Sequence, residues 1–355
     1  MIEYTRSPTH SHSPSNLHPN SESVIYRLDP SREAGKLIFQ LGTADPDLAL
    51  QAARFVAPDV AGIDVNAGCP KPFSVHCGMG AALLQTPEKL AAILRALVRE
   101  IMPEFGVGIS VKIRLLETAA ETETLVRLLV GTGITGLTVH CRTTDMRPRE
   151  RAIRGQLNMV ARVCREAGVA CLMNGDVEGR EQAEGLVAEF GVDGAMIATA
   201  AEKNPSCFRA EGKEGWEAVV ENYLRFAIEA ENKMANTKFS LTQLVPGKAG
   251  VYKQLQTCRG YVDFAETLGY TTLVEKAREL DKVLWLGDFE VKREKKKNKG
   301  QQQAKGGKQQ ANGGDQQASK KRKREEDEAK GGSAKRVVEV SEPAPTPAAS
   351  AAIAA

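Results

Sequence analysis

A cysteine at the end of an apolar run is the first residue whose setting points to chemistry. The segment Gly62-Ile63-Asp64-Val65-Asn66-Ala67-Gly68-Cys69-Pro70 begins as a strand-like stretch and ends in the pattern Asn-x-Gly-Cys-Pro. Gly68 permits a backbone turn that other residues resist, and Pro70 stiffens the chain that follows. A cysteine is more often a small buried apolar residue, but a cysteine held on a loop at a strand's end is accessible to ligands. We therefore predict a chemical role for Cys69.

Other residues of chemical interest occupy equivalent places, because each comes at the C-terminal end of a short apolar run. The runs are Leu37–Leu41, Gly62–Val65, Ile109–Ile113, Gly136–Val139, Ala170–Met173 and Gly194–Ala198. The residues at their ends are Gln40, Asn66, Lys112, Arg114, His140, Arg142, Asn174, Gly175 and Asp176. Longer amphipathic stretches separate the runs, and strands that alternate with helices are typical of a parallel sheet buried on both faces.

This pattern predicts an α/β fold, and within it a (β/α)₈ TIM barrel, whose catalytic loops gather at the C-terminal ends of the strands. A doubly wound sheet also binds ligands at that edge, but no Gly-x-Gly-x-x-Gly turn follows any run. Six runs are two fewer than a barrel requires, so we expect a barrel that lacks its first two strands. Val24-Ile25-Tyr26-Arg27 offers a fragment of another strand.

Charge and composition divide the rest of the chain. From Trp216 to Leu286 helical periodicity replaces the strand signal. Residues 291–337 hold 16 basic and 6 acidic residues, whereas residues 1–290 hold 32 basic and 37 acidic ones. We predict a disordered lead-in over residues 1–22, a partial barrel over 23–212, a small all-α domain over 213–290 and a disordered basic low-complexity tail over 291–355. Such a tail is typical of contact with nucleic acid, an acidic partner or a nuclear import receptor.

Several classes of protein are excluded by the composition. No stretch approaches 18 apolar residues without a charge, and the Ser/Pro/His-rich start has no apolar core, so we predict neither a membrane span nor a secretory leader. We expect the protein in the cytoplasm, the nucleus or both. The 7 cysteines form no Cys-x-x-Cys pair and are odd in number, which favours reduced thiols. We predict no metal site.

Several motifs in a fixed order resemble a known enzyme family. They are Phe39-Gln40-Leu41-Gly42-Thr43, Asp64 to Lys71, Gly78-Met79-Gly80-Ala81-Ala82-Leu83-Leu84, Val111-Lys112-Ile113-Arg114, Val139-His140-Cys141-Arg142 and Asn174-Gly175-Asp176. Together they are similar to the tRNA-dihydrouridine synthases, most of all to the eukaryotic branch that acts on uridine 20 of the D-loop. The resemblance implies an FMN-binding (β/α)₈ barrel, a helical domain that binds tRNA, and NADPH or NADH as reductant. The reaction it implies is reduction of the C5=C6 bond of a uridine. We expect the protein to be a monomer.

The resemblance also implies roles for individual residues. Cys69 aligns with the family's general acid, and a thiol with a reference pKa of about 8.5 is protonated at neutral pH yet able to release its proton. Gln40, Asn66, Lys112 and His140 align with residues that contact the flavin. Asn174, Gly175, Asp176, Ala198 and Thr199 stand where the family binds the FMN phosphate, although the family usually has an arginine in place of Thr199. We expect Arg114 and Arg142 to bind the substrate.

The sequence departs from the family at its start and leaves two alternatives open. The family opens with a strand that carries an Ala-Pro-Met loop, followed by a second strand, and we find neither here. One alternative is another FMN barrel that acts on a free pyrimidine, which explains the flavin residues but not the basic tail. The other is an RNA-binding protein that keeps the scaffold without the chemistry.

Overall fold

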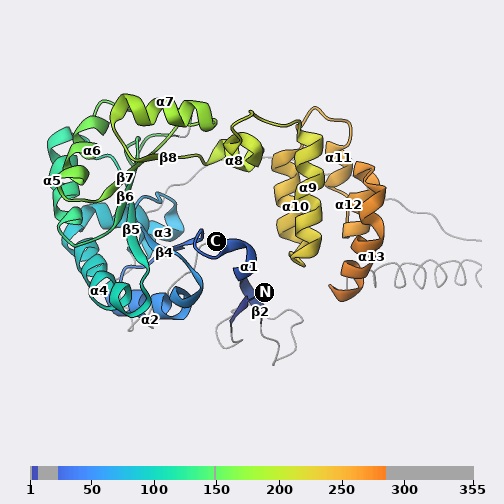
Figure 1. Cartoon of the computed structure of the whole chain (residues 1–355), viewed down its shortest axis with the longest axis horizontal. Coiled ribbons are helices and arrows are strands. Elements are labelled where there is room, and N and C mark those ends of the chain that lie inside the picture. Colours follow the sequence, from blue (N-terminus) through green and yellow to red (C-terminus); the bar gives the residue numbers. More distant parts are fainter. Residues whose placement is uncertain (1, 7–22, 148, 285–355) are drawn as a thin grey trace, which may run out of the picture. The chain divides into compact units, whose positions relative to one another are not determined.

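The computed structural model describes residues 2–6, 23–147 and 149–284 (Figure 1). These residues form two compact units, one of residues 2–222 with 240–247 and the other of residues 223–239 with 248–284. The basic tail predicted over residues 291–355 lies outside the described residues, as does most of the predicted lead-in. The domain limits that we derived from the sequence stay predictions.

The first unit is built around a parallel sheet of six strands. The strands are β3 (Ile38–Leu41), β4 (Gly62–Asn66), β5 (Gly108–Arg114), β6 (Gly136–His140), β7 (Ala170–Asn174) and β8 (Gly194–Met196). Each strand pairs with the next one along the chain. This neighbour order is that of a (β/α)₈ barrel, and it confirms the predicted fold class.

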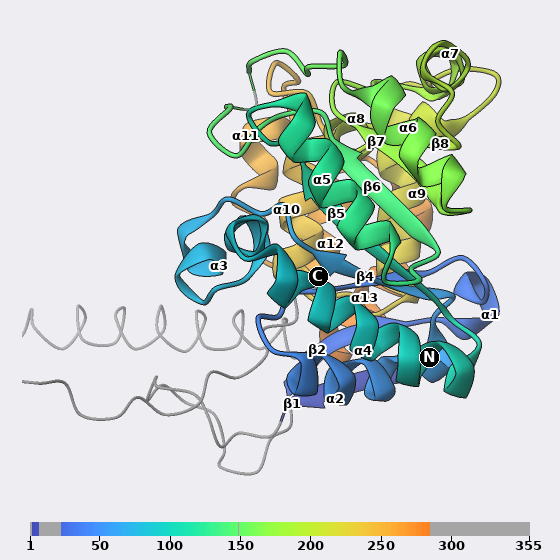
Figure 2. The ribbon, with the colours of Figure 1, turned by 90° about the vertical axis from the view of Figure 1, so that its left-hand side faces the viewer.

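Helices connect the strands and form the outer layer of the unit (Figures 1 and 2). They are α2 (Pro46–Val56), α4 (Pro87–Phe105), α5 (Ala119–Val130), α6 (Leu157–Glu166) and α7 (Arg180–Phe190). The short helix α3 (Pro72–His76) belongs instead to the segment between β4 and α4. Side chains at the helix starts fix where α2 and α5 begin. Asp45 accepts hydrogen bonds from the backbone N–H groups of Asp47 and Leu48, both at 2.9 Å, and Thr118 and Glu121 form a capping box.

Strand β5 shows how the sequence separates the core from the site. Ile109, Val111 and Ile113 are fully buried and belong to the same hydrophobic core as the inner residues of α4 and α5. The alternate residues of β5 are less buried, and because side chains alternate along a strand they lie on the opposite face of the sheet. That face carries Lys112 and Arg114.

The last predicted strand is shorter than its apolar run. The run Gly194–Ala198 forms a strand only as far as Met196, where Asn174 Nδ2 donates a 3.0 Å hydrogen bond to the carbonyl oxygen. Ala198 instead precedes helix α8 (Thr199–Lys203), with φ −114° and ψ −84°. The prediction of a strand to Ala198 is therefore wrong by two residues.

The start of the chain contains a strand that we did not predict. Strand β1 (Ile2–Arg6) pairs antiparallel with β2 (Ser23–Leu28), and the short helix α1 (Pro30–Glu33) follows. The prediction of disorder is thus wrong for residues 2–6, because we grouped this short segment with the Ser/Pro/His-rich stretch that follows it. The fragment Val24–Arg27 does lie in a strand, but that strand pairs with β1 in a separate sheet and adds no strand to the parallel sheet.

Beyond Trp216 the described chain contains helices and no strand, as the sequence indicated. The helices are α9 (Trp216–Glu229), α10 (Met234–Leu244), α11 (Tyr252–Leu255), α12 (Tyr261–Leu268) and α13 (Val274–Val283). In the second unit the buried Tyr261 hydroxyl donates to the Asn232 carbonyl and accepts from Thr237 Oγ1, both at 2.6 Å. Asp281 of α13 accepts from the N–H groups of Tyr261 and Val262 at 2.7 and 3.1 Å and so caps α12.

None of the helices in the described segments combines the length and the apolar character needed to cross a bilayer.

Candidate active site

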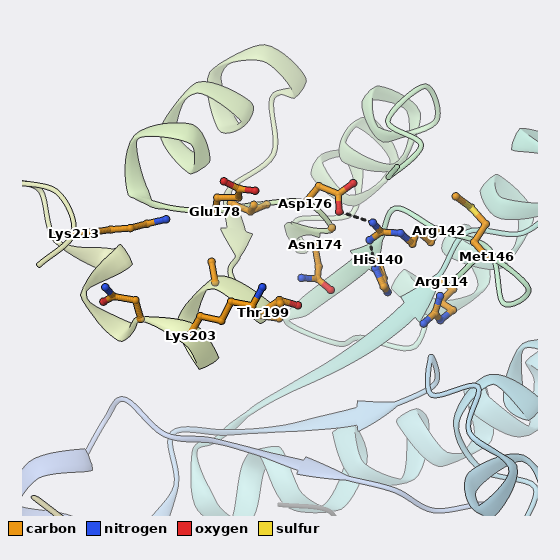
Figure 3. Close-up of a pocket in the computed structure, with 15 residues that line it drawn as sticks. Arg114, His140, Arg142, Met146, Asn174, Asp176, Glu178, Thr199, Lys203 and Lys213 are labelled. Carbon is orange, nitrogen blue, oxygen red and sulfur yellow. Dashed lines mark hydrogen bonds and ion pairs between the residues drawn. The ribbon is translucent and has the colours of Figure 1, made fainter. Parts of the chain in front are cut away.

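The predicted site residues meet at the C-terminal edge of the sheet. In the strand register Asn66 lies beside Lys112, and Arg114 lies beside His140, which in turn lies beside Asn174. A cleft of about 570 Å³ opens at this edge (Figure 3). Of the residues predicted from the sequence, it is lined by Arg114, His140, Arg142, Asn174, Gly175, Asp176, Ala198 and Thr199. Gln40, Asn66 and Lys112 come from β3, β4 and β5, and Cys69 lies on the loop after β4; none of these four residues is part of its lining.

The loop that carries Cys69 is held from both sides. Asn66 Oδ1 accepts hydrogen bonds from the N–H groups of Gly68 and Cys69, each at 3.0 Å. Arg114 Nε donates to the Gly68 carbonyl at 2.7 Å, while its Nη1 donates to the Thr143 carbonyl at 2.9 Å. Arg114 therefore ties the Cys69 loop to the loop after β6, at the rim of the cleft.

A glycine turn packs against the back of the same loop. Ala81 N donates to the Cys69 carbonyl at 2.9 Å. Gly80 has φ +59°, and a Cβ built on it would lie 2.5 Å from the Cys69 carbonyl oxygen and 2.4 Å from Ser74 Oγ. The turn therefore requires glycine at position 80, both for its backbone angle and for the close approach. The Cys69 side chain itself is half-buried, whereas the Cys77 side chain nearby is exposed.

A buried carboxylate that the sequence analysis did not select lies beneath this loop. Asp64 is 7% exposed and accepts from Gln40 Nε2 at 2.9 Å and from Ser110 Oγ at 2.7 Å. Burial raises the pKa of Asp64, and the two hydrogen bonds and the charge of Lys112 oppose that rise. The signal in the sequence was a carboxylate in the middle of an otherwise apolar strand.

Lys112 presents a cation on the same face of the sheet. Burial lowers the pKa of Lys112, while the neighbouring Asp64 charge works to raise it. Within the described segments no hydrogen bond or ion pair engages its ammonium group. The side chain is thus available to an anionic or polar ligand.

His140 is neutral in this setting. Burial, followed by the positive charges of Lys112, Arg114 and Arg142, lowers the pKa of His140 from 6.5 to about 3. Arg142 Nη1 lies 3.1 Å from His140 Nε2 (Figure 3). Because a guanidinium only donates, Nε2 accepts and the ring proton resides on Nδ1.

Arg142 forms part of the wall of the cleft. It is 6% exposed, its Nε donates to the Glu150 carbonyl at 2.8 Å, and its Nη2 pairs with Asp176. The substrate-binding role expected for Arg142 stays a prediction, and the structure adds that this side chain already holds His140 and Asp176 in place.

The turn after β7 gives the cleft a close backbone surface. Gly175 has φ +122°, and a Cβ there would come within 3.1 Å of the Ala152 Cβ and 3.4 Å of the His140 ring. Asp176, at φ 52°, accepts from the Ala152 N–H at 2.7 Å. Burial works to raise the pKa of Asp176, but this hydrogen bond and the contact with Arg142 outweigh it, so the pKa is lowered.

The far wall of the cleft carries donors suited to a phosphate. The amide groups of Thr199 and Ala200 precede the first helical hydrogen bond of α8, from Glu202 N to the Ala198 carbonyl. Lys203 and Lys213 line the cleft beside them (Figure 3), and the sequence analysis missed both because neither follows a strand. In the described part of the chain, no three His, Cys, Asp or Glu side chains are grouped to hold a metal ion.

Comparison with known proteins accounts for this arrangement of residues. A tRNA-dihydrouridine(20) synthase [NAD(P)+] of Schizosaccharomyces pombe is 48% identical over 247 residues, which cover 69% of this chain and 51% of the relative. The Saccharomyces cerevisiae protein of the same name is 41% identical over 254 residues, covering 69% of this chain and 66% of the relative. An uncharacterized tRNA-dihydrouridine synthase-like protein of Caenorhabditis elegans is 35% identical over 193 residues, covering 54% of this chain and 66% of the relative.

The chain thus spans between half and two thirds of the length of these relatives. The sequence profile of the dihydrouridine synthase (Dus) family matches residues 13–281, which include both the sheet with its Cys69 loop and the helices beyond it. That match extends over most of the chain and agrees with the resemblance carried by the strand-end motifs. This protein belongs to the dihydrouridine synthase family.

Proposed function

We propose that this protein is an FMN-dependent tRNA-dihydrouridine synthase that reduces the C5=C6 bond of uridine 20 in the D-loop, with NADPH or NADH as reductant. The names of the two yeast relatives support the substrate, the position and the nicotinamide. The observation that carries the proposal is the Cys69 loop, which Asn66 and Arg114 fix beside a cation-lined cleft.

The donors of the site fit FMN. The α8 amides with Lys203 and Lys213 would hold the phosphate, and Gln40, Asn66, Lys112 and the His140 Nδ1–H would hold the ring. When bound, FMN supplies the hydride that NADPH or NADH delivers to the site. The ammonium of Lys112, which has no hydrogen-bond or ion-pair partner among the described residues, suits a group that gains negative charge on reduction.

The thiol of Cys69 completes the reduction. Uracil gains a hydride at C6 and a proton at C5, so the reaction needs one proton donor near C5. Cys69 Sγ–H gives this proton, and the thiolate is reprotonated from solvent through the half-buried position of its side chain. Arg114 binds the Gly68 carbonyl and so holds this loop at the rim of the cleft. The thiol would therefore lie at the same edge of the sheet as a uridine bound in the cleft.

The direct test supplies purified protein with NADPH and either unmodified tRNA or free uracil. We expect the protein to purify with a yellow chromophore. It should form dihydrouridine in tRNA and should not reduce free uracil to dihydrouracil. Reduction of free uracil alone identifies the alternative barrel enzyme. A colourless protein that binds tRNA and forms no product identifies the scaffold without chemistry. A transcript with uridine 20 replaced by cytidine checks the position.

A further inference from the structure

A continuous chain of hydrogen-bonded side chains connects β5 to the Cys69 loop. Ser110 Oγ donates to Asp64 Oδ1 at 2.7 Å, and Gln40 Nε2 donates to Asp64 Oδ2 at 2.9 Å. Asn66 Nδ2 donates to Gln40 Oε1 at 3.0 Å, and Asn66 Oδ1 accepts from the N–H groups of the loop. We call the side chains of Ser110, Asp64, Gln40 and Asn66 the Asp64 chain.

The direction of the Asp64 chain is fixed at its loop end. The backbone N–H groups of Gly68 and Cys69 only donate, so Asn66 must point its oxygen at the loop and its NH₂ group at Gln40. Gln40 must then turn its oxygen to Asn66 and its NH₂ group to position 64. The residue at position 64 therefore has to accept a hydrogen bond.

The other end of the Asp64 chain imposes the same direction independently. An ionised carboxylate is acceptor-only, and Asp64 receives a donor on each oxygen. A donor at this place would face the NH₂ group of Gln40 and favour a flipped amide. A flipped Gln40 would in turn face Asn66 with a second NH₂ group and turn the Asn66 oxygen away from the loop.

We propose that Asp64 is a positioning residue, which holds the Cys69 loop by fixing the orientation of the Gln40 and Asn66 amides. Its meaning for catalysis rests on the proposed function, in which Cys69 donates a proton. The positioning itself does not depend on the reaction.

A different role for Asp64 is as the counter-charge of Lys112, and two substitutions separate the roles. In Asp64→Asn the side-chain oxygen still accepts from Gln40, while the amide donates to the Ser110 hydroxyl, so the direction survives without the charge. Asp64→Leu keeps the branching at Cγ with somewhat larger groups and accepts no hydrogen bond. Both changes are made in a Cys77→Ser background, because Cys77 is exposed and the other five cysteines besides Cys69 are buried.

Two measurements report on the loop without using the reaction. One is the hydrogen exchange of the Gly68 and Cys69 amides, and the other is the rate at which iodoacetamide alkylates Cys69. In Asp64→Leu we expect exchange at these two amides to rise about tenfold or more and alkylation to change several-fold. In Asp64→Asn both should stay within about twofold of the parent. The β6 ladder amide of Val139 should exchange at the parental rate in both variants, which excludes general destabilisation.

Unchanged amide exchange and Cys69 alkylation in Asp64→Leu would overturn the proposal. Exchange and alkylation rates that change as much in Asp64→Asn as in Asp64→Leu would also overturn it, because the lost charge would then be the cause. If Asp64→Leu does not fold, Gln40→Met breaks the same chain one link later and leaves the carboxylate in place. It should expose the Gly68 and Cys69 amides alike, and protected amides there overturn the proposal. A folded protein that shows this pattern but forms no dihydrouridine refutes the proposed function and leaves the positioning role intact.

Discussion

Cys69 is the side chain on which the proposed reaction depends most directly. The substitution Cys69→Ala removes the proton donor, and losing a general acid costs about 10²–10⁴ in rate. Single-turnover reduction of tRNA should slow by that factor, while reduction of the enzyme-bound flavin by NADPH stays near the parental rate because the thiol acts on the uracil. Cys77→Ala, at the exposed cysteine, is the matched control and should change neither rate. Equal tRNA reduction in Cys69→Ala and parent would remove Cys69 from the mechanism.

His140 makes the fold sensitive to acid. Its pKa of about 3 lies below the ordinary 6.5, so between these values the unfolded chain binds a proton that the folded chain excludes. Stability therefore falls as the pH drops through this range and gains nothing from His140 above it. His140→Gln keeps an acceptor for Arg142 and does not titrate, so the loss of stability from about pH 7.5 to about pH 4.5 should be smaller. Urea unfolding at the two pH values measures this, and an equal loss in parent and variant would contradict it.

The positions of residues at strand ends explain how far the site could be predicted residue by residue. Lys112, Arg114, His140 and Asn174 were selected because parallel strands end at one edge of the sheet, and the strand register does place the last three side by side there. The ion pair between Arg142 and Asp176 was not predictable, because it depends on the left-handed backbone conformation of Asp176, which brings residues from two loops together.

The loop between β6 and α6 places three exposed arginines near the rim of the cleft. Arg142 Nε holds the Glu150 carbonyl, and the Glu150 carboxylate accepts from Arg147 N at 2.6 Å, which fixes the turn that presents them. Replacing Arg147, Arg149 and Arg151 with alanine should weaken tRNA binding. The slope of log K against log [salt] should flatten by about 0.7–0.9 for each phosphate that the variant no longer neutralises.

The control for the arginine loop is an equal loss of charge elsewhere. Lys89, Arg95 and Arg99 are exposed on α4, on the helical side of the sheet. Their replacement with alanine should leave the salt slope unchanged. Equal slopes for both triple variants would show that the β6–α6 loop makes no particular contact with RNA. NADPH-driven flavin reduction, measured without tRNA, should be parental in both.

Helix α12 depends on a cap supplied by another helix. Asp281→Ala removes the acceptor of the Tyr261 and Val262 N–H groups, and unsatisfied buried donors cost about 1–3 kcal/mol each. We expect a loss of that order in the free energy of unfolding, measured by urea denaturation. Glu279→Ala, at an exposed position of the same helix, should stay within about 0.5 kcal/mol of the parent. If Asp281→Ala changes the free energy of unfolding as little as Glu279→Ala does, water satisfies the Tyr261 and Val262 N–H groups in the variant.

The local sequence predicted the elements that follow the repeating strand–helix pattern of the parallel sheet. The six parallel strands were visible because each is a short β-branched or apolar run followed by a polar or glycine-containing loop. Strand β1 was not predicted, because its five residues lie next to a Ser/Pro/His-rich stretch and it belongs to a separate antiparallel pair with β2. The end of β8 was misjudged because the side chain of Asn174, from the neighbouring strand, bonds the Met196 carbonyl.

Over the full length of the protein, charge is divided between the acidic body and the basic segment from residue 291 onward. That segment lies outside the described residues. We predict from its sequence that it tethers RNA, directs nuclear import, or does both, and the alternative is a solvated tail that aids solubility. Deleting residues 291–355 should weaken tRNA binding at low salt. The salt slope should flatten by about 0.7–0.9 for each phosphate that the shortened chain leaves unneutralised.

The uridine that is modified should not change on this deletion, because contacts to phosphates position RNA without reading its bases. Equal affinities and equal salt slopes in the full and shortened chains would exclude the tether. The location of a fluorescent reporter fused to the segment then tests import alone.

Gly80 sets a limit on how this protein can diversify by mutation. Any side chain there would collide with the carbonyl group of Cys69, so no single step at that position is neutral. The arginines of the β6–α6 loop face solvent and are under no such steric limit. Under the proposed function, changes at the β6–α6 loop can therefore alter the affinity for RNA, whereas the turn beside the thiol accepts only glycine at position 80.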